Sequence, residues 1–165
     1  FPDVKVIKNN KNLGFSAGVN IGVKSTDGDV LLILNPDTIV EPNTIHRLYR
    51  ALKSRKDIGI VGAKILNPSG SFQLSSRRAF PSIFTSFFHV TGLSYFFPNS
   101  SILSKYNYLY KDNNTSHEVD SVSGSCMMFK RELYDKLCGF DEDFFLFFEE
   151  TDFCIRAKQF GLKNF

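Results

Sequence analysis

The chain has 165 residues, of which 42% are hydrophobic and 22% are charged, a composition that allows one globular domain with a sizeable core. A formal net charge of +3, with acidic and basic residues mixed along the chain, argues against nucleic acid as a partner. No apolar run is long enough to span a bilayer. The three cysteines form no CxxC pair, which argues against a disulfide framework and indicates a reducing, cytoplasmic compartment.

The first elements along the chain predict an α/β fold. An alternating, β-branched stretch at residues 4–7 predicts a short strand. After a turn that contains glycine, Ala17, Ile21 and Lys24 recur at helical spacing, which predicts a helix over residues 16–25. Residues 30–34 form a continuous apolar run bounded by turn signals, which is typical of a strand buried on both faces of a parallel sheet.

The next elements continue this alternation. After Pro42, apolar residues at positions 45–52 recur at i, i+3, i+4 and i+7, which predicts a helix with one buried stripe. The stretch IGIVGAKIL at residues 58–66 predicts another strand. This order of strands and helices predicts an α/β architecture in which a mostly parallel sheet is flanked by helices, with right-handed crossovers.

Residues 67–118 have no clear period and are basic and aromatic, with no acidic residue before Asp112. Within them, residues 80–97 are rich in phenylalanine and carry no charge, and a helix would group several apolar side chains on one side. This stretch has two interpretations, a peripheral contact with a membrane interface or a core or lid helix. In the first, Arg77 and Arg78 would meet anionic headgroups or a pyrophosphate.

The last part of the chain predicts three more elements. Residues 119–129 predict a strand with Gly124 inside it, and residues 130–137 predict a short helix. The tail FDEDFFLFFEETDFCIRAKQFG interleaves carboxylates with phenylalanines, and residues 149–159 within it predict a helix with Gly161 past its end.

A candidate site begins where the strand at residues 30–34 ends on Asn35-Pro36-Asp37. In open α/β sheets ligands lie beyond the carboxyl ends of strands, so Asp37 is placed where a ligand would bind. A carboxylate there can hold Mg²⁺ or Mn²⁺ shared with a phosphate. The alternative is a type I turn with Pro36 at its second position, the commoner role of this tripeptide.

A second candidate is the acidic run from Glu149 to Asp152. On a helix, Glu149 and Asp152 share one face while Glu150 points elsewhere, so the run offers one carboxylate to a site and others to structural partners such as Arg156. Crowded carboxylates raise each other's proton affinity, which suits a general base near neutral pH. The alternative is a solvated acidic helix start, which the interleaved phenylalanines disfavour.

The chain carries three stretches in one order, NKNLGFSAGVNIGV, GDVLLILNPDTIVEP and VSGSCMMFKRELYDKLCGFDEDFFLFFEETDFCIRAKQFG. Together they resemble the family 2 glycosyltransferases with a GT-A-type (Rossmann-like) fold, most closely the rhamnosyltransferase-like branch. The resemblance covers nearly all of the chain except its Phe-rich middle. It implies inverting transfer of a sugar, such as rhamnose, from a dTDP- or UDP-linked donor to a glycan or lipid-linked acceptor in bacterial surface polysaccharide synthesis, with Mg²⁺ or Mn²⁺ as cofactor.

The resemblance also implies roles for matched positions. Asp37 matches the metal-side carboxylate of a D-x-D-like motif, in which Asn35 stands in place of the first aspartate. Glu150 matches the base that takes the acceptor proton, and Glu149 and Asp152 stay candidates because glutamate replaces the usual aspartate. The further donor-side candidates are Asn12, Gly14, Asn20 and Arg156, and the candidates for acceptor or phosphate contact are Arg77 and Arg78.

We expect residues 1–165 to form one partial catalytic domain, with residues 67–118 as an insertion on its acceptor side. The chain opens on Phe1 without the family's opening strand and base-reading aspartate, which predicts a fragment that binds donor weakly and turns over slowly or not at all. The alternative function is a non-catalytic module that binds a nucleotide-sugar or a glycan. A sugar nucleotidyltransferase is a third reading, but the Gly-rich basic loop that it needs near the N-terminus is missing.

Overall fold

The computed structural model describes residues 3–165, and Phe1 and Pro2 of the expected opening loop lie outside the described residues. A central sheet has four strands in the order β1-β5-β2-β6. Their bounds are Val30–Leu34 (β1), Cys126–Lys130 (β5), Ile58–Gly62 (β2) and Lys163–Asn164 (β6). β5 is antiparallel to β1 and β2, whereas β2 and β6 are parallel. The expected common direction therefore holds for β1, β2 and β6, and the reversed β5 makes the sheet mixed.

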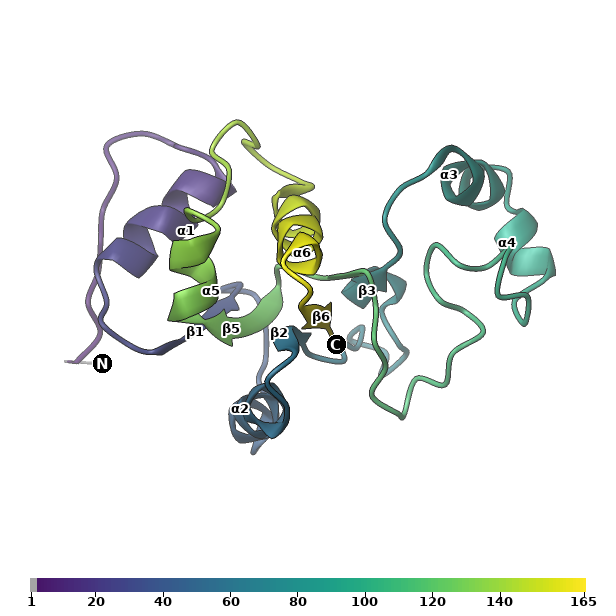
Figure 1. The fold of residues 1–165 in the computed structure, drawn as a ribbon, viewed down its shortest axis with the longest axis horizontal. Coiled ribbons are helices and arrows are strands. Elements are labelled where there is room, and N and C mark those ends of the chain that lie inside the picture. Colours follow the sequence, from purple (N-terminus) through teal and green to yellow (C-terminus); the bar gives the residue numbers. More distant parts are fainter. Residues whose placement is uncertain (1–2) are drawn as a thin grey trace.

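Helices cover both faces of this sheet, with α2 on one face and α1, α5 and α6 on the other (Figure 1). Their bounds are Thr44–Ser54 (α2), Phe15–Lys24 (α1), Arg131–Lys136 (α5) and Glu149–Gln159 (α6). Successive side chains of β5 point to opposite faces, so that Met128 packs in the cluster with Leu52 of α2 while Phe129 contacts Phe153 of α6. The predicted layered α/β architecture is confirmed.

The buried stripe of α2 is narrower than the apolar pattern predicts. Leu48 and Leu52 are buried, whereas Ile45 and Tyr49 are about half exposed. Leu48 and Leu52 lie one turn apart and pack on β2 and β5, which is sufficient to hold the helix on the sheet. The helix and strand types predicted between residues 15 and 62 are all confirmed.

Two predicted strands are wrong. Residues 4–7 are not in a strand, and Val6 is 84% exposed, because no described strand pairs with this segment. The strand predicted over residues 119–129 is broken into β4 (Ser121–Val122) and β5 by a turn at residues 123–125. In that turn the Ser123 hydroxyl accepts a hydrogen bond from the Ser125 amide, which bends the chain away from a continuous ladder.

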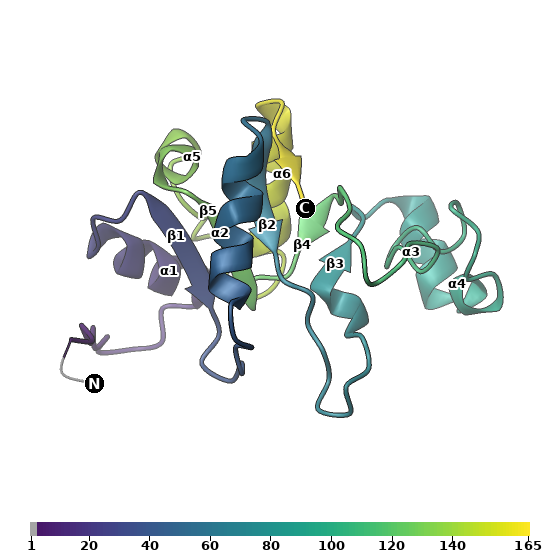
Figure 2. The ribbon, with the colours of Figure 1, turned by 90° about the horizontal axis from the view of Figure 1, so that it is seen from below.

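An arm, residues 79–118, extends away from the sheet to one side (Figures 1 and 2). The short helix η1 (Leu74–Ser76) and strand β3 (Arg77–Arg78) lead into it, and β3 pairs antiparallel with β4 on its return. The arm contains α3 (Ile83–Val90) and α4 (Leu93–Phe96), followed by a run of turns. α3 begins with a capping box between Ser82 and Thr85, which explains its start.

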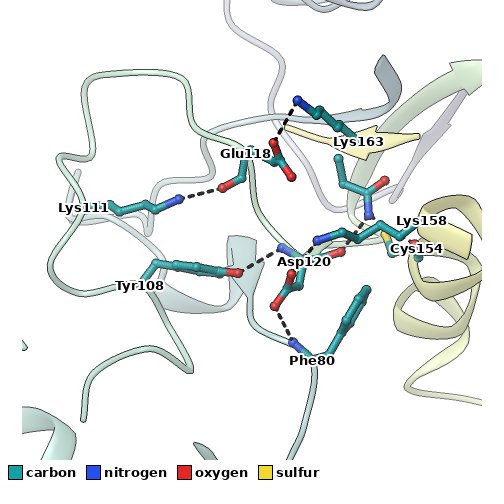
Figure 3. A network of polar contacts seen from close by, with 9 residues as sticks. Phe80, Tyr108, Lys111, Glu118, Asp120, Cys154, Lys158 and Lys163 are labelled. Carbon is teal, nitrogen blue, oxygen red and sulfur yellow. Dashed lines mark hydrogen bonds and ion pairs between the residues drawn. The ribbon is translucent and has the colours of Figure 1, made fainter. Parts of the chain in front are cut away.

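A network centred on Asp120 joins the arm to the body (Figure 3). The Asp120 carboxylate accepts hydrogen bonds from the Phe80 amide at 3.2 Å and from Lys158 Nζ at 2.7 Å. The Tyr108 hydroxyl oxygen accepts a hydrogen bond from the Asp120 amide at 3.1 Å. Because Phe80 opens the arm and Lys158 belongs to α6, this network fixes the arm against the helix that carries the acidic run.

Candidate functional site

The site begins at the carboxyl end of β1, where the chain turns. The Thr38 amide donates to the Asn35 carbonyl at 3.3 Å, which closes a turn with Pro36 and Asp37 at its centre. The Asn35 amide donates to the Ser125 carbonyl at 3.0 Å, and its side-chain amide donates to the Ser125 hydroxyl at 3.4 Å. Residues 35–38 therefore form the expected turn, which is hydrogen-bonded to the loop before β5. Asp37 is exposed beyond the end of the strand.

Glu150 lies on the other side of this loop. A Cβ added to Gly124 would be 3.6 Å from the Glu150 Cβ, so the loop lies close beside the first turn of α6. Arg78 Nη2 donates to Glu150 Oε1 at 2.6 Å, and the side chains are only 25% and 7% exposed respectively. The site thus combines Asp37, the 123–125 loop and a buried ion pair. Arg78, predicted to contact an acceptor or phosphate, contacts Glu150 instead.

Glu149 is buried beside this ion pair. Its Oε2 has no hydrogen-bond partner within residues 3–165. Burial raises the pKa of the Glu149 carboxyl, and the nearby charge of Glu150 raises it further. Asp152, by contrast, pairs with Arg156 one turn later at 2.6 Å, so both Glu150 and Asp152 have an arginine partner whereas Glu149 Oε2 has none among residues 3–165.

The turn that leads into α6 is conformationally strained. Phe147 and Phe148 both have left-handed backbone, with φ of 71° and 69°. Such conformations cost on the order of 1 kcal/mol or more per residue outside glycine and concentrate at functional sites. The Phe148 carbonyl accepts from the Asp152 amide at 2.8 Å, so this strained turn begins the helix and fixes where Glu149 and Glu150 emerge.

Two of the predicted donor-side residues shape the start of α1. Asn12 Oδ1 accepts from the Gly14 amide at 3.0 Å. Gly14 has φ of 86°, and a Cβ there would lie 2.5 Å from the Phe145 carbonyl oxygen. Because Phe15 donates its amide to that same carbonyl at 2.8 Å, only glycine allows α1 to approach the loop before α6.

Asn20, predicted to bind donor, has no hydrogen-bonding capacity left for a ligand. Its side-chain amide donates to the Phe140 carbonyl at 2.8 Å and to Glu142 Oε1 at 2.9 Å. Its side-chain oxygen accepts from the Tyr134 hydroxyl at 2.9 Å and from the Phe140 amide at 3.0 Å. All four hydrogen-bonding positions of the amide are used within the protein, which gives Asn20 a structural role, and its contact with the donor stays a prediction.

Arg156 was predicted on the donor side and is also engaged within the protein. Its Nη1 donates to the Leu137 carbonyl at 2.7 Å and to the Gly139 carbonyl at 3.0 Å, and its Nε donates to Asp152 at 2.7 Å. These bonds hold the end of α5 against α6. Arg156 therefore positions the acidic helix, and the donor role expected for it stays a prediction.

Arg77 likewise serves the arm. Its Nη2 donates to two main-chain carbonyls and to one side chain of residues 108–113, and its guanidinium lies over the Phe72 ring, 5.0 Å from the centroid. Burial lowers the pKa of Arg77. Arg77 therefore acts as a clamp that closes the turns of the arm onto β3, and its contact with an acceptor or phosphate stays a prediction.

No cluster of three His, Cys, Asp or Glu residues that could hold a metal occurs in the part of the chain that the structure describes. Asp37 offers one exposed carboxylate. A cation there would need most of its ligands from a bound phosphate, which is how Mg²⁺ is commonly held.

Sequence patterns did not predict the loop or the ion pair as parts of the site. Ser123 and Ser125 flank a glycine directly before a strand, a signal that could have been interpreted as a turn at the sheet edge. The pairing of Arg78 with Glu150 spans 72 positions and leaves no local signal.

The profile of "Glycosyl transferase family 2" matches residues 1–138. The chain belongs to this family. Membership carries the GT-A type of fold, which agrees with the mixed sheet and its flanking helices. The matched region includes the Asn35-Pro36-Asp37 turn and the 123–125 loop, and α6 follows it.

Curated relatives extend the similarity over α6. A low-salt glycan biosynthesis hexosyltransferase of Haloferax volcanii is 29% identical over 161 residues, covering 95% of this chain and 47% of the relative. The N-acetylglucosaminyl-diphospho-decaprenol L-rhamnosyltransferase of Mycobacterium tuberculosis is 27% identical over 172 residues, covering 98% of this chain and 55% of the relative. An O-antigen biosynthesis protein of Myxococcus xanthus is 26% identical over 152 residues, covering 87% of this chain and 11% of the relative. The chain thus spans about half the length of the first two relatives.

Proposed function

We propose that this chain carries the catalytic centre of an inverting glycosyltransferase, which moves a sugar from a nucleoside-diphosphate donor to a hydroxyl of a glycan or lipid-linked acceptor. The observation that carries the proposal is the position of Glu150. It is buried, held by Arg78, and separated from the Asn35-Pro36-Asp37 turn only by the 123–125 loop. A proton acceptor and a carboxylate suited to the donor phosphates therefore flank one loop at one sheet edge.

In the proposed reaction the acceptor oxygen forms a bond to the anomeric carbon of the donor sugar. The bond from that carbon to the diphosphate oxygen breaks, and the departing diphosphate keeps the electron pair. The proton of the acceptor hydroxyl passes to the carboxylate of Glu150. Attack opposite the leaving group inverts the anomeric centre.

Each neighbouring residue has a part in this scheme. Arg78 orients the Glu150 carboxylate through its 2.6 Å contact. Asp37 faces the donor diphosphate, and with that diphosphate would hold a Mg²⁺ or Mn²⁺ ion, since such ions use few protein carboxylates and several phosphate oxygens. The ion, when bound, would offset the charge that grows on the leaving diphosphate. Asn35 adds no charge, and its amide is directed to Ser125.

The names of the relatives support finer proposals on substrates and place. One relative is named as a rhamnosyltransferase acting on a decaprenol-linked sugar and another as a hexosyltransferase of glycan biosynthesis. We assign to this chain a dTDP- or UDP-linked hexose donor, rhamnose first, and a lipid-linked acceptor, with residues 67–118 on the acceptor side. A nucleotide donor and a lipid-linked acceptor meet at the cytoplasmic face of the plasma membrane, which is the location we propose.

The test is a transfer assay with the intact protein, using labelled dTDP-rhamnose or UDP-hexoses and a polyprenyl-diphosphate-linked N-acetylglucosamine acceptor. Glu150→Gln keeps the shape of the side chain but removes the base, so we expect kcat to fall about 100-fold or more. Asp37→Ala removes the donor contact and should raise the KM for donor and lower kcat. Glu132→Gln, an exposed carboxylate on α5, is the matched control and should leave both constants unchanged.

Near-normal turnover in both site variants would refute the assignment. Donor binding by the wild-type protein without any transfer would support instead a non-catalytic nucleotide-sugar-binding module. Calorimetry with dTDP and UDP, with and without Mn²⁺, measures that binding separately from transfer.

A further inference from the structure

The outer side of the arm exposes large apolar side chains. α3 has no buried residue, and Ile83 and Phe84 are 87% and 74% exposed. On a helix, positions 83, 84, 87 and 90 fall within about one third of the circumference. Together with two residues at the end of α4 they form what we call the arm's apolar surface, namely Ile83, Phe84, Phe87, Val90, Phe96 and Phe97.

The fold of the arm does not need these side chains to be apolar. The inner side of α3 supplies its packing, where the His89 ring stacks on the Tyr106 ring with centroids 4.5 Å apart. Ser94 of α4 is buried, and α3 and α4 lie side by side in Figures 1 and 2. Six exposed apolar residues on two adjacent short helices therefore form a patch of the kind that marks an interaction site.

The charge distribution around this patch favours a phospholipid surface. No Asp or Glu occurs from residue 58 to residue 111, and since Arg78 is paired with Glu150 and Arg77 is bound within the arm, the remaining basic residues of this range are Lys64, Lys105 and Lys111. Membrane surfaces that contain anionic lipid attract basic residues and repel carboxylates. Lys105, next to the patch in sequence, is exposed and makes no ion pair among residues 3–165.

The same distribution disfavours a second protein molecule as the occupant. Protein interfaces commonly surround an apolar centre with a polar, charged rim. Residues 79–104, which contain the whole patch, carry no Asp, Glu, Lys or Arg, so this part of the arm lacks a rim of mixed charge, whereas aromatic side chains suit the headgroup region of a bilayer.

We propose that the arm's apolar surface docks on a phospholipid bilayer, with α3 lying along the membrane interface and its phenylalanines inserted below the headgroups. The biological role of this docking rests on the lipid-linked acceptor proposed above, but docking itself can be measured independently of sugar transfer. No helix within the described residues is both long and apolar enough to cross a membrane.

The test is flotation of the purified protein with vesicles of phosphatidylcholine, alone or mixed with phosphatidylglycerol. The wild-type protein should float with both and more strongly with the anionic mixture. Each inserted phenylalanine contributes roughly tenfold to partitioning, so Phe84→Ser combined with Phe87→Ser should lower the partition coefficient about 100-fold. Lys105→Glu should lower binding to the anionic vesicles and leave binding to phosphatidylcholine unchanged.

Val6→Ser is the matched control, because Val6 is equally exposed and belongs to the N-terminal segment at the opposite end of the molecule (Figure 1). It should float as the wild type does. Wild-type protein that stays with the soluble fraction in both vesicle types would overturn the proposal, as would equal loss of flotation in the Val6→Ser control. The proposal would also be overturned if the wild-type protein does not float but sediments as a dimer, and if that dimer dissociates in the variant with Phe84→Ser and Phe87→Ser. That result would favour self-association.

Donor binding by calorimetry is measured on the same samples, so a failure of docking is distinguishable from a failure of the proposed transferase function.

Discussion

Arg78 and Glu150 define the chemistry of the site at the residue scale. Two charged side chains that are this little exposed are stable only as a pair, because removing one leaves the other desolvated and unpaired. The structure therefore separates two roles for Arg78. A residue that contacts the donor phosphates would mainly affect donor affinity, whereas a residue that orients Glu150 would mainly affect turnover.

We expect Arg78→Ala to lower kcat about 10- to 100-fold while the KM for donor changes little. The reason is that the substitution removes the group that orients Glu150 and leaves the contacts of the donor in place. Arg78→Lys keeps a positive charge without the guanidinium geometry and should restore part of the activity. Steady-state kinetics with varied donor measures both constants. A large rise in donor KM with unchanged kcat would instead identify Arg78 as a phosphate contact.

At this scale, sequence patterns predict the position of a residue in an element better than they predict its hydrogen-bond partners. Asp37 at the end of β1 follows from a local pattern of an apolar run and a proline turn. Asn20 looked equally suited to a ligand, but its partners, Tyr134, Phe140 and Glu142, are more than 110 residues away. Whether a polar side chain is free or satisfied depends on such distant partners, which no local pattern encodes.

At the scale of elements, periodicity identified the helices well, because the apolar face of a helix can be recognised from the sequence of that helix alone. Strand direction was harder. β5 enters the sheet between β1 and β2 after the chain has passed through the arm, and nothing in residues 126–130 indicates that they run against their neighbours. Residues 4–7 have strand composition without a described partner strand, and pairing rather than propensity decides whether a strand forms.

The Asp120 network is the element-scale connection between arm and body. Burial raises the pKa of the Asp120 carboxyl, but the hydrogen bonds from Lys158 and the Phe80 amide, together with the charge of Lys158, outweigh it and hold that pKa below its ordinary value. A lowered pKa in the folded state means that this stability is present above the unfolded pKa, and is lost as the pH falls through the folded value.

We therefore expect Asp120→Asn to lower the free energy of unfolding at pH 7 by about 1–3 kcal/mol, the usual range for hydrogen bonds to a charged group. The difference from the wild type should shrink below about pH 4, where the Asp120 carboxyl of the unfolded state begins to be protonated, and should vanish as the pH falls through the lower pKa of the folded state. Urea unfolding at several pH values measures this. Asp135→Asn, an exposed carboxylate on α5, is the control and should be neutral, and a pH-independent loss in Asp120→Asn would contradict the electrostatic account.

At the scale of the whole molecule, the chain consists of a layered body and an arm that leaves it after β3 and returns at β4 (Figure 2). The two halves of the body are interlocked. β1 and β2 precede the arm, whereas β5 follows it and lies hydrogen-bonded between them. The arm is therefore the part of the chain that can be cut without separating the strands of the sheet.

We expect limited trypsin digestion to cut first at Lys105 in the turns of the arm and at lysines in the irregular segment 3–14, because exposed chain without regular structure is cleaved most readily. Arg50 and Lys53 in α2 should resist, since their helix packs on the sheet. After cleavage at Lys105, a denaturing gel should show two large fragments, while gel filtration without denaturant should show one particle of unchanged size, because β5 stays paired with β1 and β2. Mass spectrometry identifies the cut sites. Separation of the fragments on gel filtration, or first cuts inside α2, would contradict this arrangement of body and arm.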